Sequence, residues 1–276
     1  MSLRIVFLIL ALPVSAFASD YHSPRTAALG GAGRGGPLLT DAIFLNPAMN
    51  SFLPSYQVNG SFNSYSGKDD TEPKGRVLHY SIQDGRNTLF QAGLAYTKRA
   101  DGAFVHLGVS KAVAQRIGVG IGSKYAFNSA TREKAVDSTL SMIASPIDWF
   151  QGSFVVDNLI ESSKAQTWNL YREFAFGFKF NVKSMLMAYF DPHYIPNKPG
   201  AAFGYEFGLE LPLFQDFFLR WGKSENSMQP HVAAYGDGYG MGIGWIFPRL
   251  SIDLALSRTV NPVQTNNKMI SFTVSY

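Results

Sequence analysis

The chain has 276 residues, of which 16% are charged and 14% aromatic, and its 24 basic and 20 acidic side chains leave a formal net charge of +4. The charged fraction is low against the roughly 25% of soluble domains, although a soluble secreted protein could share the near-zero mean hydropathy, and the small charge excess does not suggest a nucleic-acid partner. The mean hydropathy is −0.01. A membrane β-barrel, apolar outside and polar inside, fits all of these values.

Residues 1–18 contain Arg4, an apolar run over residues 5–12, Pro13 and a small-residue ending at Ala18. This order of basic, apolar and small residues predicts a secretory signal peptide, with the mature chain beginning at Ser19. The apolar run is too short to span a bilayer, and no later stretch approaches the roughly 18 to 20 apolar residues of a membrane helix. We therefore expect any membrane crossing to use strands. The chain contains no cysteine, so a closed ladder of hydrogen bonds has to supply the stability that disulfides give many exported proteins.

Residues 26–50 are rich in glycine and lack the alternation of a strand. Glycine permits backbone conformations that other residues avoid, so the stretch is suited to a folded, irregular path. We predict that residues 19–50 form a plug inside a barrel made by residues 51–276.

Beyond residue 54, period-2 patterning predicts about fourteen strands separated by turn residues. The expected spans are 55–65, 74–84, 88–98, 102–111, 115–128, 137–145, 149–158, 171–182, 184–192, 201–211, 215–224, 237–247, 249–259 and 267–276. The chain is therefore predicted to be all-β.

The connections between these strands alternate in length. Tight joins are expected at 85–87, 112–114, 146–148, 183, 212 and 248, and longer polar ones at 67–73, 129–136, 159–170, 193–200, 225–236 and 260–266, with a short exception at 99–101. Outer-membrane barrels have short periplasmic turns, longer outer loops and an even number of strands. The pattern thus predicts a transmembrane antiparallel barrel with both termini in the periplasm.

Within the strands, bulky apolar residues occupy one face and ionisable residues the other. Phe174, Phe176, Phe178 and Phe180, for example, alternate with residues that include Glu173 and Lys179. The apolar face suits lipid, so the ionisable face is assigned to the lumen. The candidate lumen-lining residues are His79, His106, Gly118, Gly120, Gly122, Lys124, Glu173, Lys179, Glu206, Glu210, Arg220, Gly240, Gly242, Gly244 and Asp253.

Two glycine rows on this inward face, 118/120/122 and 240/242/244, have two interpretations. They either admit a backbone or ligand close to the wall or relieve strand curvature. Arg25, Arg34 and Asp41 in the plug are expected to pair with charged residues of the lumen, and we interpret these ionisable residues as structural charge balance.

The final residues, 268–276, place Phe272 and Tyr276 on one side of the last strand. This ending resembles the C-terminal strand of outer-membrane barrels, in which a terminal aromatic residue helps recognition by the barrel assembly machinery. Phe272 and Tyr276 are therefore the candidate assembly signal, although phenylalanine is the commoner final residue.

The stretch that leads to Asp41, Asn46, Pro47 and Ala48 resembles the N-terminal hatch of the FadL family, the outer-membrane transporters of long-chain fatty acids and other hydrophobic compounds. In that family a Gly/Ala-rich segment leads into an acidic-Ala element and an Asn-Pro-Ala motif before the first of fourteen strands. Pro47 fixes φ and keeps Asn46 out of the helical region, so the chain is expected to turn there. The family is usually longer, with large outer loops, and this chain lacks that extra length. The family's side opening is not visible in the sequence, and Gly93 is a guess at its position.

The resemblance implies passive uptake of fatty-acid-like or aromatic molecules in the bacterial outer membrane, with hydrophobic ligands, membrane lipids and lipopolysaccharide as partners. A non-transport barrel that acts as a scaffold or secretion accessory is the alternative. An outer-membrane lipid hydrolase is a third hypothesis, but no Gly-x-Ser-x-Gly elbow occurs, and His79 and His106 are expected to face the lumen, away from lipid. We predict no enzyme activity, and no metal cluster, phosphate loop or nucleotide fingerprint implies a cofactor.

Overall fold

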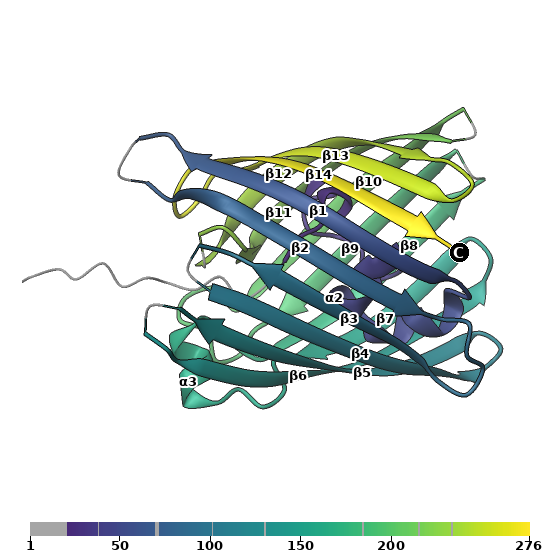
Figure 1. Cartoon of the computed structure of the whole chain (residues 1–276), viewed down its shortest axis with the longest axis horizontal. Coiled ribbons are helices and arrows are strands. Elements are labelled where there is room, and N and C mark those ends of the chain that lie inside the picture. The colour runs from purple at the N-terminus through teal and green to yellow at the C-terminus, as the bar shows by residue number, and fades with distance from the viewer. Residues whose placement is uncertain are drawn as a thin grey trace, which may run out of the picture.

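The structure is a computed structural model that describes residues 21–276 except 38, 70, 71, 101, 130, 184, 215 and 233. The predicted signal peptide lies outside the described residues. The described part is a closed antiparallel β-barrel of fourteen strands in which β1 pairs with both β2 and β14 (Figure 1). The expected strand number and all-β class are confirmed.

The strands are β1 (Tyr56–Gly67), β2 (Lys74–Asp84), β3 (Gln91–Lys98), β4 (Gly102–Ala114), β5 (Ile117–Asn128), β6 (Lys134–Ile147), β7 (Phe150–Asp157), β8 (Glu173–Val182), β9 (Leu186–Tyr194), β10 (Phe203–Leu213), β11 (Phe217–Gln229), β12 (Ala234–Ile246), β13 (Leu250–Thr259) and β14 (Thr265–Ser275). Neighbours in sequence are neighbours in the wall, as expected for a chain joined by simple hairpins.

Burial alternates along the strands with the period of the pleat. In β2, Val77, His79 and Ser81 are buried, whereas Leu78 and Tyr80 are exposed. The exposed positions around the wall carry large apolar side chains, and the buried ones are mostly small, polar or charged. An apolar exterior around a polar interior is the pattern of a barrel whose outer face contacts lipid.

One end of the barrel has the shorter connections. Five of its six joins contain two or three residues: 115–116, 148–149, 183–185, 214–216 and 247–249. The sixth, 85–90, is longer than expected because Asn87 folds it into a turn, with its side-chain oxygen accepting a hydrogen bond from the Leu89 N–H at 2.8 Å. The chain ends at the same end of the barrel (Figure 1).

The other end carries the joins 68–73, 99–101, 129–133, 158–172, 195–202, 230–233 and 260–264. The predicted loop 225–236 was wrong, because a β-bulge between Ser224 and Ser227 absorbs the irregularity and pairing resumes at Ser227↔Gly236. The connection 158–172 is longer than expected and contains α3 (Ser163–Thr167). From this loop, Trp168 and Leu170 pack with Phe104 at the barrel end.

Ladder pairing is continuous at Gly93, which faces Gln83 on one side and Gly108 on the other. The structure therefore does not support the guess that the wall kinks there. Pairing lapses instead between β8 and β9, where Ala175↔His193 is followed by Phe178↔Phe190. Pro192 lies in this interval and has no N–H to donate to the ladder.

The N-terminal segment, defined here as residues 21–53, lies within the barrel (Figure 1). It contains α1 (Pro24–Ala28), η1 (Leu39–Asp41), α2 (Ala42–Leu45) and η2 (Pro47–Phe52). Helix α1 packs against β11–β14, whereas η2 packs against β3–β6. The segment therefore bridges opposite arcs of the wall.

Candidate functional site

Short-range capping fixes the beginning of the N-terminal segment. The Ser23 hydroxyl accepts a hydrogen bond from the Thr26 N–H at 3.2 Å, and Pro24 occupies the first turn of α1. Serine is a favourable N-cap and proline is tolerated at the first helical position. These residues start a helix of only five residues, so packing against the wall has to stabilise it.

The Asn46–Pro47 step turns the chain as the sequence predicts. Asn46 is extended, with φ −159°, and Pro47 begins η2. The fully buried Asn46 side chain donates to the Arg34 carbonyl at 2.8 Å and so ties the two halves of the segment together. The Ala48 N–H donates to the Ser141 hydroxyl at 2.9 Å, which anchors the motif to β6.

Asp41 precedes α2 but makes no side-chain cap hydrogen bond with it. Its carboxyl instead accepts a hydrogen bond from the Ser23 hydroxyl at 2.8 Å. Burial raises the pKa of Asp41 to about 7, an effect that the Ser23 hydrogen bond and the charge of Arg25 only partly oppose. The segment thus contains one carboxyl group that titrates near neutral pH.

The predicted glycine row on β5 faces the backbone of η2. A Cβ at Gly120 would meet the Pro47 carbonyl carbon at 2.6 Å, and one at Gly118 would meet the Ala48 oxygen at 2.8 Å. A Cβ at Gly122 would lie 3.1 Å from the Pro47 ring. Close backbone approach is therefore the physical reason for glycine at the first two positions.

The second row, on β12, divides between two roles. A Cβ at Gly240 would collide with the Ala27 carbonyl, and one at Gly242 would lie 2.7 Å from the Ala28 Cβ. Gly244 instead leaves room for a charged pair, since its Cβ would meet the Arg220 guanidinium at 2.5 Å. The first two residues seat α1, and the third accommodates an ion pair.

Two glycines that the sequence did not single out make equally close approaches. A Cβ at Gly222 of β11 would collide with the Leu29 backbone, and one at Gly177 of β8 with the backbone at Arg34 and Gly35. The alternation of the neighbouring residues predicts that both glycines face the lumen. It does not predict which residue of the segment lies opposite each of them. These glycines allow the backbone of the wall and the backbone of the segment to approach each other closely.

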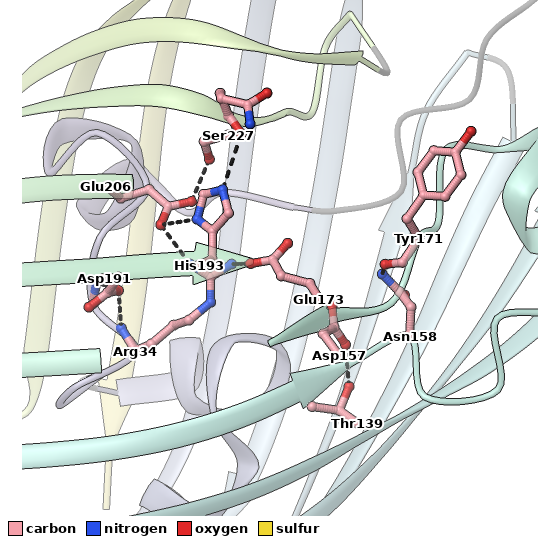
Figure 2. A network of polar contacts seen from close by, with 12 residues as sticks. Arg34, Thr139, Asp157, Asn158, Tyr171, Glu173, Asp191, His193, Glu206 and Ser227 are labelled. Atoms are coloured by element: carbon pink, nitrogen blue, oxygen red, sulfur yellow. Dashed lines mark hydrogen bonds and ion pairs between the residues drawn. The ribbon is translucent and has the colours of Figure 1, made fainter. Parts of the chain in front are cut away.

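A network of charges surrounds Arg34 (Figure 2). Its guanidinium donates to Glu206 and Glu173, each at 2.9 Å. Asp191 accepts hydrogen bonds from the Gly33 and Arg34 N–H groups, each at 2.7 Å. Both ion-pair carboxylates are at most 5% exposed. Such pairs keep their strength because little water screens them.

The network continues beyond Arg34 to the long-loop end. His193 contacts Glu206 through Nδ1 at 3.2 Å and the Asn226 carbonyl through Nε2 at 3.1 Å, and Ser227 also binds Glu206. Asp191, His193 and Ser227 were missed from the sequence. Asp191 and His193 are two residues apart on β9, so period-2 alternation was the signal for their shared inward face.

A second cluster holds α1. Arg220 pairs with Glu210 and, at 2.6 Å, with Asp253, while Arg25 lies 3.6 Å from Glu210. The ammonium of Lys179 lies 5.6 Å from the Tyr189 ring centroid and interacts electrostatically with Glu210 of this cluster. The structure thus divides the four predicted carboxylates between two clusters, one at each arginine of the segment.

Lys124 and the two predicted histidines lie on other parts of the wall. Lys124 on β5 pairs with Asp157 and contacts Asn158 at 3.1 Å. His79 stacks on Tyr21, and His106 lies near Phe44, with ring centroids 6.3 Å apart. The histidines therefore contact aromatic rings of the segment.

The candidate assembly residues are outside the lumen. Phe272 is 47% exposed on the outer face of β14, and Tyr276 is 69% exposed at the end of the chain. The backbone of Tyr276 exchanges hydrogen bonds with that of Tyr56 at 3.2 and 2.8 Å. This contact joins the end of the chain to the first strand at the closure of the barrel.

Two small internal cavities lie beside the segment within the described part of the chain. One internal cavity, bordered by Tyr21, Phe44, Arg34 and Glu206, measures about 20 Å³, and a second, near His231, is the same size. A volume of roughly 10 to 15 Å³ holds one water molecule. Neither cavity holds an organic molecule with the segment in this position. A third hollow, of about 810 Å³, lies on the outer face, where Leu209, Trp221 and Ile243 are among its lining residues.

In the described residues, no helix is long and apolar enough to cross a membrane. Comparisons with protein-family models and with curated proteins found no match. Solved structures do match. The toluene transporter TodX of Pseudomonas putida is 12% identical over 94% of this chain and 98% of its own, with a TM-score of 0.65.

Two further structures are equally similar. The toluene transporter TbuX of Ralstonia pickettii is 10% identical over 92% of this chain and 98% of its own, with a TM-score of 0.68. The CymD monoaromatic hydrocarbon channel is 10% identical over 92% of this chain and 97% of its own, with a TM-score of 0.66. All three are channels of the FadL family, and the fold fits an outer-membrane location. The chain therefore has the fold of the FadL-family channels.

Proposed function

We propose that this chain is an outer-membrane channel for the passive uptake of hydrophobic small molecules and that the N-terminal segment is its hatch. The observation that carries the proposal is the segment buried within a closed barrel that has an apolar exterior. Three barrels of the same fold are named as transporters or channels for toluene or monoaromatic hydrocarbons. Aromatic hydrocarbons and fatty-acid-like molecules are accordingly the substrate classes to test first.

The cavity volumes support a gated channel over a permanently open one. Internal spaces of about 20 Å³ are too small for toluene, so passage requires the segment to move or the wall to part. The two halves of the segment are held differently. Residues 24–36 are held by ion pairs with the wall, whereas η2 is held by packing and by the hydrogen bond from the Ala48 N–H to the Ser141 hydroxyl. We infer that η2 moves first, because its displacement breaks no charge pair.

The domain division follows from the same reasoning. Residues 1–18 are proposed as a signal peptide, 19–50 as the hatch and 51–276 as the barrel. The short-turn end, where β14 finishes, is proposed to face the periplasm, with Phe272 and Tyr276 presented to the barrel assembly machinery. The prediction that the N-terminus is also periplasmic concerns residues outside the described part. Lipids and lipopolysaccharide are the proposed surroundings of the outer face.

Uptake into vesicles tests the proposal. The purified full chain is reconstituted into vesicles whose outer leaflet contains lipopolysaccharide, and the influx of radiolabelled toluene is measured against vesicles without protein. A channel is expected to accelerate toluene influx down its concentration gradient without added energy. The influx rate should rise almost in proportion to the toluene concentration. Equal rates with and without the chain contradict the proposed function.

A non-transport barrel remains the second candidate because the buried ion pairs of Arg25 and Arg34 also suit a permanent stopper. In that case the barrel is a scaffold or a secretion accessory, and it co-purifies stably with a partner while toluene influx stays at the protein-free rate. The similar structures are channels rather than enzymes. We therefore propose no catalytic role for His79 or His106.

A further inference from the structure

The Tyr21 ring occupies a fitted site on the inner wall. It is 5% exposed and stacks on the His79 imidazole with a centroid distance of 3.8 Å and an interplanar angle of 2°. Phe44 meets the Tyr21 ring edge-on at 5.2 Å and 79°, and it meets His79 at 5.7 Å and 81°. Parallel and edge-on arrangements of this kind are the favourable geometries for aromatic pairs.

The hydroxyl of Tyr21 is bound as specifically as its ring. It forms a hydrogen bond with the Ser61 hydroxyl. Ser61 and His79 are direct cross-strand partners on β1 and β2, and His79 is held by the Thr97 hydroxyl on β3, with Nδ1 and Oγ1 2.8 Å apart. Three neighbouring strands therefore place the His79 imidazole against the ring of Tyr21 and the Ser61 hydroxyl against its phenolic oxygen.

The binding groups belong to the barrel, and the bound phenol belongs to the segment. Ser61, His79 and Thr97 lie on β1, β2 and β3, so the ladder of the wall, and not the segment, sets their backbone positions. A site that hydrogen-bonds a hydroxyl disfavours an analogue without it, because the buried partner is left unsatisfied. Groups arranged in this way are therefore expected to favour a phenol over a plain hydrocarbon.

We propose that Ser61, His79 and Thr97 form a binding site for hydroxylated monoaromatic molecules and that Tyr21 occupies it in the closed state. The proposal rests on the proposed function, since it names the substrate class of that channel. The adjoining cavity of about 20 Å³ is too small for a second ring, so a phenol binds only by replacing Tyr21. A ligand that binds only after Tyr21 has left stabilises the displaced segment, and phenols thereby promote their own passage.

The probe is p-cresol, which has the ring and hydroxyl of a tyrosine side chain, and toluene is the same molecule without the hydroxyl. Influx of both is measured in vesicles containing the wild-type chain, Ser61→Ala or Ser81→Ala. Ser81 is a buried serine on the same inner face of β2 as His79, and its hydroxyl forms no hydrogen bond with any residue in the described part of the chain, so it is the matched control. Each rate is corrected for influx into protein-free vesicles.

One hydrogen bond contributes about 0.5 to 1.5 kcal/mol, which is roughly a 2- to 12-fold change. Ser61→Ala is therefore expected to lower the ratio of p-cresol to toluene influx by about 2- to 12-fold, while Ser81→Ala leaves the ratio at the wild-type value. An unchanged ratio in Ser61→Ala, or an equal fall in Ser81→Ala, overturns the proposal. If neither compound enters faster than in protein-free vesicles, the proposed function fails.

Calorimetric titration tests the site without relying on transport. In Tyr21→Ala the competing ring is absent, so p-cresol is expected to bind more tightly than to the wild-type chain and more tightly than toluene binds to the same variant. The double variant Tyr21→Ala/Ser61→Ala is expected to lose the preference for p-cresol over toluene. Equal binding of the two compounds to Tyr21→Ala means that the cavity accepts any ring, and it overturns the phenol site.

Discussion

Replacing Arg34 with glutamine removes the cation that joins the N-terminal segment to β8 and β10. In the wild-type chain, displacing this part of the segment breaks hydrogen-bonded ion pairs to Glu173 and Glu206, each 2.9 Å long and nearly excluded from water. In Arg34→Gln there are no such pairs to break. The closed position therefore loses stability relative to the displaced one.

The size of the effect follows from what Arg34 leaves behind. Removing one partner of a buried ion pair typically costs about 3 to 5 kcal/mol. Glu206 keeps its contacts with His193 and Ser227, so the lower end of that range applies. A difference of about 3 kcal/mol corresponds to roughly a 100-fold change in the population of the displaced state, at tenfold per 1.4 kcal/mol.

The assay is toluene influx into vesicles with equal amounts of folded protein, verified by the heat-dependent gel mobility of the barrel. Arg34→Gln is expected to accelerate influx by up to about 100-fold where movement of the segment limits the rate. Arg116→Gln is the control, because Arg116 pairs with Asp148 at 3.0 Å on the exposed short-turn end. Influx in Arg34→Gln that equals or falls below the wild-type rate refutes the reasoning.

Three further changes act on the same segment. Gly120→Val forces side-chain atoms into the Pro47–Ala48 backbone, which destabilises the closed position of the segment by about 1 to 3 kcal/mol and should raise toluene influx. Gly60→Val is the control and should leave influx unchanged, because a Cβ at Gly60 meets only the Tyr80 ring at 3.8 Å. The raised pKa of Asp41, about 7 against 3.8, contributes stability to the closed segment that is fully present below about pH 4 and is lost as pH rises through about 7, while the carboxylates that pair with Arg25 and Arg34 act in the opposite direction at acid pH. Toluene influx should follow that rise and lose this dependence in Asp41→Asn. Deleting residues 27–48 should give a folded, leaky barrel by gel mobility and influx, and loss of the barrel itself would show that the segment is chiefly structural.

The barrel could be predicted from the sequence because its signals are local. Alternation along each strand, as in Phe174–Val182, reports which face meets lipid, and glycine, proline and asparagine mark the turns. The exception at 225–236 is instructive. Polar residues there resembled a loop, but Ser227 and Gln229 are polar because they face the lumen, and the bulge beside Asn226 keeps them paired to β12.

The partners inside the lumen could not be predicted because they depend on register and on the path of the segment. The sequence indicated that Arg25 and Arg34 would meet carboxylates, but Arg34 meets Glu173 and Glu206 only because the backbone at Gly35 fits against Gly177. Long-range contacts of this kind leave no local pattern. Tyr21 is a clear case, since nothing around it in the sequence points to His79.

The most direct test of the account is to lock the segment in the closed barrel. The chain has no native cysteine, and a Cβ at Gly242 lies 2.7 Å from that of Ala28 and 2.5 Å from the Leu254 carbonyl oxygen, so Ala28→Cys/Gly242→Cys reaches disulfide geometry after a shift of about 1 Å. Toluene influx is compared in the oxidised and reduced forms of the same vesicles, with each single variant as control. The account predicts that oxidation slows influx, because α1 stays in place after η2 has moved, and that reduction restores it, whereas equal influx in both forms would contradict a segment whose two halves both have to move.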